Sequence, residues 1–121
     1  MYTIKEASAK VKMSPYTLRY YERAGILPKI VRTPSGNRRF SDADIQWIEM
    51  VHCLRSTGMS IARIKRYVDL AAKDDTIEQR RQMMLDHKQI TEQKIADLVA
   101  NLQQINNKID YYNRALKRPA C

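Results

Sequence analysis

The sequence predicts a mainly α fold, in which a winged helix-turn-helix domain is followed by a long dimerisation helix. Three observations support this prediction. Two short segments with helix-capping signals lie near the N-terminus and precede a turn-rich basic segment. Residues 77–116 contain neither Gly nor Pro. The 22 basic side chains outnumber the 13 acidic ones, which leaves a net charge of +9. We expect boundaries at 1–73 for the first domain, 74–116 for the long helix and 117–121 for a short tail.

The first two predicted helices form a helix-turn-helix. Thr3 and Glu6 have the spacing of a capping box, which predicts a helix over about residues 4–11. Ser14 is a second N-cap, with Pro15 at the first helical position, where its missing N–H is not needed. Gly25 supplies the left-handed residue that ends this second helix. The second helix is therefore the expected recognition helix.

A basic hairpin is expected next. Residues 29–32 and 38–40 are predicted as short strands around the turn-forming cluster TPSGN at positions 33–37. Residues 14–40 carry six basic side chains against one acidic one, a surplus of five. A helix beside an arginine-bearing wing is suited to binding DNA in a sequence-specific way.

A third and a fourth helix should complete the first domain. Ser41 and Asp44 cap the third helix, Gly58 ends it, and Ser60 caps the fourth. The third helix should present a broad apolar face made by Ile45, Trp47, Ile48, Met50, Val51 and Leu54. The fourth should bury Ile61, Ile64, Val68 and Ala71.

The long helix carries an apolar heptad stripe. A helix over residues 77–116 would be about 60 Å long. Its apolar positions alternate in steps of three and four: Ile95, Leu98, Leu102, Ile105, Ile109, Tyr112 and Leu116. No other part of this small chain is long enough to cover such a stripe, so the pattern predicts a homodimer. The apolar pattern in the N-terminal half of this helix is less regular, and we expect that half to contact the helix-turn-helix domains of the dimer.

Composition excludes several classes of protein. No apolar run is long enough for a membrane span, and the N-terminus does not resemble a signal peptide. Two cysteines do not make a disulfide framework, so a cytoplasmic location is expected. No Cys–His pair, Ser–His–Asp set or Gly-rich phosphate loop is recognisable, so an enzyme is not expected, nor are a cofactor and a resident metal.

The segments TLRYYERAGIL at positions 17–27 and GNRRF at positions 36–40 resemble the signature of the MerR family of bacterial transcription regulators. The resemblance implies promoter DNA as the partner and antiparallel pairing of the long helices. It also implies a pseudo-palindromic operator that is bent and untwisted, through which RNA polymerase is affected indirectly. The family's DNA contacts map onto Tyr16, Thr17, Arg19, Tyr20 and Arg23 in the recognition helix, Arg32, Asn37 and Arg38 in the wing, and Arg55 near a second wing. Where the family usually has an aromatic residue, this chain has Asn37.

Cys53 is the expected sensing residue. It lies about 140° from the centre of the apolar arc of its helix, and Arg55 nearby is a cation of the kind that favours a thiolate. The segment CLRSTGMS at positions 53–60 resembles the aldehyde- and thiol-stress-responsive (NmlR- and AdhR-like) branch of the family. In that branch a lone cysteine at this place would be alkylated or oxidised. From spacing alone, a small buried side chain is the alternative.

Two other functions remain open at the level of sequence. A metal-responsive regulator would need thiolates, and Cys121 could supply them only by pairing across a dimer. A nonspecific architectural DNA-binding protein would have a similar basic surface. His52 and His87 lack the spacing of a chelating cluster.

Overall fold

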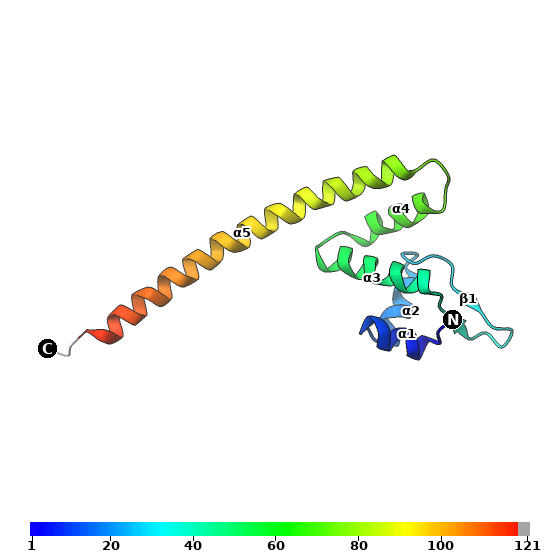
Figure 1. Cartoon of the computed structure of the whole chain (residues 1–121), viewed down its shortest axis with the longest axis horizontal. Helices are drawn as coiled ribbons and strands as arrows, with labels where there is room; N and C mark the ends of the chain where they lie inside the picture. The colour runs from blue at the N-terminus through cyan, green and yellow to red at the C-terminus, as the bar shows by residue number, and fades with distance from the viewer. Residues whose placement is uncertain (119–121) are drawn as a thin grey trace. The chain divides into compact units, whose positions relative to one another are not determined.

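The computed structural model describes residues 1–118 and is mostly helical (Figure 1). The order of elements is α1 (Ile4–Val11), α2 (Pro15–Arg23), β1 (Val31–Arg32), β2 (Arg38–Arg39), α3 (Asp42–Ser56), α4 (Ile61–Ala71) and α5 (Ile77–Lys117). The chain divides into two compact units, one from Met1 to Met83 and the other from Met84 onward. The first turns of α5 therefore belong to the first unit. No helix among residues 1–118 is long and apolar enough to span a membrane.

The predicted helix starts are confirmed by their caps. The Thr3 side chain accepts from the Glu6 N–H while the Glu6 carboxylate accepts from the Thr3 N–H. Ser41 and Asp44 form the same reciprocal pair at α3. Ser14 and Ser60 each accept one backbone N–H at the starts of α2 and α4. Each cap satisfies a donor that the first helical turn leaves without a partner.

Glycine ends α2 as predicted. Gly25 has φ +76°, in the left-handed region where a side chain is strained. A Cβ at this position would also lie 3.3 Å from the Lys65 Cε of α4. The close approach and the backbone angle together favour Gly at this turn.

The first unit has one apolar core to which α1, α2, α3, α4 and the residues flanking the hairpin contribute. Its most deeply buried large side chains are Phe40, Leu18, Ile26, Ile48, Ile64 and Val51. Trp47 of α3 and Tyr67 of α4 lie with ring centroids 5.6 Å apart. This core fixes α2 and the hairpin with respect to α3 and α4.

The expected broad apolar face of α3 is narrower in the structure. Ile45, Ile48, Val51 and Leu54 are buried along one stripe, whereas Trp47 is only half-buried and Met50 is 43% exposed. Met50 lies at the edge of the stripe, where it borders an open hollow with Trp47, Ala43, Gln46 and Tyr67. Only part of the predicted apolar face is therefore buried, and Met50 lies at its exposed edge. In α4, Ile64 and Val68 are buried as expected, but Ile61 and Ala71 are half-buried.

The hairpin strands are also shorter than predicted. The register pairs Val31 with Arg39 and Arg32 with Arg38, so residues 29–30 and 40 lie outside the two strands. Ile30 is buried. Phe40 forms an isolated antiparallel bridge with Tyr2, with N–H···O distances of 2.7 Å in both directions. The N-terminus thus lies at the base of the hairpin (Figure 1).

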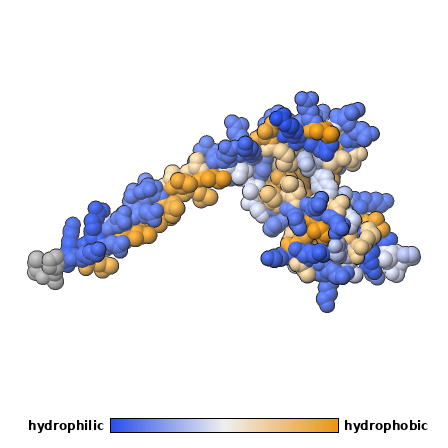
Figure 2. Space-filling view, viewed as in Figure 1, coloured by the Kyte–Doolittle hydropathy of each residue, from blue (hydrophilic) through white to orange (hydrophobic). Residues whose placement is uncertain are grey.

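The long helix α5 is continuous to Lys117, one residue beyond its predicted end. From Met84 onward, no described side chain of this helix is buried. The seven predicted stripe residues are between 50% and 84% exposed. Figure 2 shows apolar side chains following one side of this helix.

Candidate nucleic-acid interface

The recognition helix presents one face to solvent and one to the core. Leu18 and Tyr21 are buried and face the core. Tyr16 is 70% exposed, and Tyr20, Arg19 and Arg23 are also exposed. Exposed aromatic and cationic side chains on one short helix are able to contact bases and phosphates.

Thr17 has a structural role within this helix. Its N–H donates to Ser14 Oγ at 3.1 Å, and its hydroxyl lies 2.9 Å from the same oxygen. The side chain is half-buried. Thr17 therefore supports the helix start, and its predicted DNA contact is not tested by this geometry.

The wing is a two-stranded hairpin with a polar tip. Within the turn, the Thr33 N–H donates to the Asn37 carbonyl at 2.7 Å and the Gly36 N–H donates to the Thr33 carbonyl at 2.8 Å. Asn37 is exposed, and its amide lies 3.4 Å from Ser35 Oγ. Asn37 is thus accessible at the wing tip, where an amide can bind a phosphate oxygen.

A single carboxylate links the wing to the recognition helix. Glu22 Oε1 of α2 accepts from Arg38 Nε at 2.9 Å and from Arg32 Nη2 at 3.1 Å. Arg32 Nη1 also donates to the Gly36 carbonyl at 3.1 Å. Two of the arginines that the sequence assigns to DNA are therefore already bonded in the free protein.

A basic cleft forms where the start of α1, the recognition helix and the wing meet. It is about 290 Å³ in volume and is lined by Thr3, Ile4, Arg19, Gly36, Asn37, Arg38 and Arg39. The cleft brings together Arg19, Asn37 and Arg38, which the sequence nominated separately. Three guanidinium groups lining one open cleft favour an anion such as a backbone phosphate.

Arg39 is a candidate that the sequence argument missed. The resemblance to the family assigned only Arg38 of these two neighbouring arginines to DNA binding. In this two-residue strand both line the cleft, and Arg39 Nη1 donates to the Arg38 carbonyl at 2.9 Å. The signal in the sequence was the surplus of basic residues in the segment and not their periodicity.

Arg55 lies in the last turn of α3, just before the turn that leads to α4. Its Nη1 donates to the Met59 carbonyl at 3.1 Å, which holds the guanidinium against this turn. Burial raises the pKa of the Tyr21 hydroxyl, and the charge of Arg55 partly opposes that rise. Arg55 is exposed and close to the recognition helix, so it remains a candidate for DNA binding.

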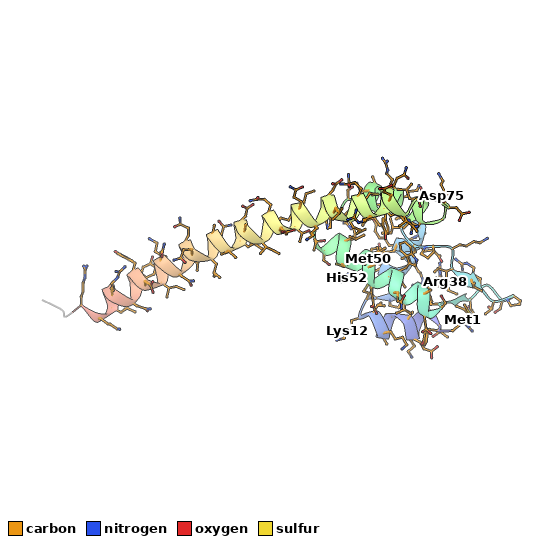
Figure 3. The ribbon with its side chains drawn as sticks, turned by 45° about the horizontal axis from the view of Figure 1, so that its top comes forward. Met1, Lys12, Arg38, Met50, His52 and Asp75 are labelled. Atoms are coloured by element: carbon orange, nitrogen blue, oxygen red, sulfur yellow. The ribbon has the colours of Figure 1, made fainter. Side chains whose placement is uncertain are left out.

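Cys53 is exposed on α3. It lies outside the buried stripe of that helix, as its angular position predicts, and the alternative of a buried side chain is wrong. Figure 3 labels its neighbours Met50 and His52 on the same helix. Cys121 lies outside the described residues. Within residues 1–118 no group of three or more His, Cys, Asp or Glu side chains is arranged to hold a metal ion.

Two sequence families match this chain. Residues 2–71 match the MerR HTH family regulatory proteins, and residues 45–108 match the region described as MerR, DNA binding. The chain belongs to the MerR family. It is accordingly a DNA-binding transcriptional regulator, and this is a family without enzymatic activity.

Individual members of the MerR family agree with this assignment. A helix-turn-helix transcriptional regulator of Haemophilus influenzae is 39% identical over 94% of this chain and 85% of its own length. AdhR of Bacillus subtilis is 37% identical over a region that covers 71% of this chain and 62% of AdhR. HiNmlR, a MerR regulator lacking the sensor domain and solved with promoter DNA, is 39% identical, with a TM-score of 0.87 over 94% of this chain and 91% of that one. These similarities confirm the NmlR- and AdhR-like branch expected from positions 53–60.

Proposed function

We propose that the chain is a homodimeric regulator whose DNA-bound state is set by thiol-reactive electrophiles, above all reactive aldehydes, through Cys53. The observation that carries the proposal is the exposure of Cys53 on α3, in the unit that also holds the recognition helix and wing. An exposed thiol is accessible to small electrophiles, whereas a buried one is inert.

The proposed dimer rests on α5. Seven apolar side chains at heptad spacing are each half-exposed or more, and a surface of this kind is stabilised by burial against a like helix. The antiparallel orientation is the family's, and it is proposed here on that ground. A dimer carries two winged helix-turn-helix domains related by a two-fold axis, and this symmetry favours a pseudo-palindromic operator.

The DNA contacts are proposed to divide between backbone and bases. Side chains in the wing and at the C-terminal end of α3 bind phosphates and position the protein: Arg32, Asn37, Arg38 and Arg55. Tyr16, Thr17, Arg19, Tyr20 and Arg23 in the recognition helix include the few side chains that specify sequence. The bound operator is bent and untwisted, which alters promoter shape for RNA polymerase without direct contact. A cytoplasmic location follows from this role.

The proposed chemistry at Cys53 is reversible addition. The sulfur attacks the carbonyl carbon of an aldehyde, a C–S bond forms as the C–O π bond breaks, and the thiol proton ends on the oxygen. The product is a hemithioacetal on α3. Because Leu54, the next residue, is buried in the core of the first unit, a bulky adduct at Cys53 can shift how α3 packs.

Two relatives support this choice of signal. HiNmlR is described as lacking the sensor domain, and this chain spans 91% of it. By analogy, we propose that the signal acts on the helices described above. The similarity to AdhR points to the same branch.

A reporter strain tests the proposal. The wild type, Cys53→Ser and Cys121→Ser are compared under formaldehyde, methylglyoxal, diamide, copper and zinc. Cys121→Ser is the matched control, since Cys53 and Cys121 are the only two cysteines in the sequence. We expect aldehyde or diamide to change promoter activity in the wild type and in Cys121→Ser but not in Cys53→Ser.

The opposite pattern favours a metal-responsive regulator. A response to copper or zinc that is lost in Cys121→Ser and kept in Cys53→Ser would reject the proposal for Cys53. Footprinting separates an architectural protein from both, because a regulator protects a discrete operator and an architectural protein protects DNA broadly.

A further inference from the structure

Glu22 is the only acidic residue within residues 14–40, the segment that holds the recognition helix and the wing. A carboxylate on a surface that meets DNA repels phosphate, so its presence there needs a physical reason. One of its oxygens accepts from arginines of both wing strands, at 2.9 Å from Arg38 and 3.1 Å from Arg32. The carboxylate therefore joins β1 and β2 to α2.

The ion pair between Glu22 and Arg38 is partly shielded from solvent. Both side chains are 20% exposed, whereas the Arg32 side chain is 46% exposed. Screening by water and salt is weaker for a shielded pair, so the Arg38 contact is the more persistent of the two.

The two arginines use their nitrogens differently. Arg32 uses both terminal nitrogens, one on Glu22 and one on the Gly36 carbonyl, so it braces the wing tip. Arg38 uses Nε on Glu22. A guanidinium has five N–H donors, so the four on the terminal nitrogens of Arg38 remain for another acceptor. Arg38 also lines the basic cleft with Arg19 (Figure 3 labels Arg38).

We propose that Glu22 is a positioning residue for DNA recognition. It holds the wing on the recognition helix and aims the terminal nitrogens of Arg38 at a backbone phosphate. The negative charge of Glu22 weakens binding to DNA of any sequence. The fixed geometry of wing and recognition helix favours an operator, because only there can both elements make their contacts at the same time. The role of Glu22 is thus to raise specificity and not overall affinity.

The test compares Glu22→Gln with Glu49→Gln. Each removes one negative charge from a glutamate, and Glu49 is exposed on α3 outside the segment that forms the wing and recognition helix. Affinities are measured at several salt concentrations for an operator selected by the wild-type protein from random duplexes and for a scrambled duplex of equal length. We expect Glu22→Gln to weaken operator binding about tenfold without weakening binding to scrambled DNA. Glu49→Gln should change both affinities by the same small factor.

A double-mutant cycle with Arg38→Ala tests the link to Arg38. Once Arg38 is absent, Glu22→Gln should leave the operator-to-scrambled affinity ratio unchanged. The proposal is overturned if Glu22→Gln lowers that ratio equally with and without Arg38, or if it behaves like Glu49→Gln. Parallel loss of both affinities with a lower melting temperature would make Glu22 a residue of stability alone and would also overturn the proposal.

Discussion

The two units of this chain differ in where their apolar side chains lie. Among residues 1–118, every buried hydrophobic side chain belongs to the unit from Met1 to Met83. In the unit from Met84 onward, apolar side chains follow a regular heptad stripe from Ile95 to Leu116, yet this stripe is exposed throughout. The first unit has several elements that cover one another, and the second is one helix with nothing of its own to pack against.

This difference separates two sources of structure. The first unit completes its core within one chain, so its stability should not depend on protein concentration. The second unit can bury its stripe only by association, so its stability should depend on concentration. The same kind of substitution should therefore have different consequences in the two units.

The largest effect should come from a charge in the stripe of α5. Leu102→Asp places a carboxylate at an apolar seam position that is 53% exposed in the single chain. Burying that charge in a dimer is unfavourable, so the dimer should dissociate at micromolar concentrations and operator affinity should fall on the order of 100-fold. Sedimentation velocity and a DNA-binding titration measure the two effects.

The matched control is Gln104→Asp, two residues away and off the stripe, which adds the same charge to an exposed position. It should remain dimeric. If the Leu102→Asp variant is still a dimer, the stripe from Ile95 to Leu116 is not the dimer interface. The proposed difference between the two units would then be wrong as well.

An intermediate effect is expected in the core of the first unit. Ile48 is fully buried in α3, and Ile48→Ala should lower the free energy of unfolding by about 2–5 kcal/mol through lost burial and a residual cavity. Urea denaturation at two protein concentrations should give the same loss at both. The neighbouring exposed Glu49→Ala is the control, and a loss for Ile48→Ala that changes with concentration would contradict an autonomous core.

The smallest effect should come from the capping box of α1. The Thr3 backbone N–H, and then its side chain, lower the pKa of Glu6 below its ordinary value of 4.5. The charged form is thus favoured in the folded state, so its stabilising contribution is complete above pH 4.5 and is lost as the pH falls through the lowered pKa.

When the pH is lowered from about 6 to about 3, the melting temperature of Glu6→Gln should therefore fall by less than that of the wild type. Glu49→Gln is the control for removing a carboxylate without a cap. Equal acid sensitivity of the wild type and Glu6→Gln would mean that the cap does not contribute to stability.

The sequence predicted those features that depend on residues close together in the chain. Each N-cap acts over three residues, so Ser14, Ser41 and Ser60 located the starts of three helices. The absence of Gly and Pro predicted α5 to within one residue at its end.

Features that join distant residues could not be predicted in this way. Periodicity identifies an apolar face but does not say how much of it is covered, and Met50 at the edge of that face is 43% exposed. The contacts of Glu22 with Arg32 and Arg38 span 10 and 16 residues and follow from packing of the hairpin on α2. For the same reason, the sequence could not assign Arg39 to the basic cleft.

The bridge between Tyr2 and Phe40 has a consequence for handling the protein. Tyr2 is held by backbone bonds to Phe40, by its hydroxyl on Asp42 at 2.8 Å and by Lys10 over its ring. A purification tag or a fusion partner attached ahead of Met1 would therefore begin one residue from the base of the wing, beside the surface proposed to meet the double helix. Binding constants for this protein should be measured after such an extension has been removed.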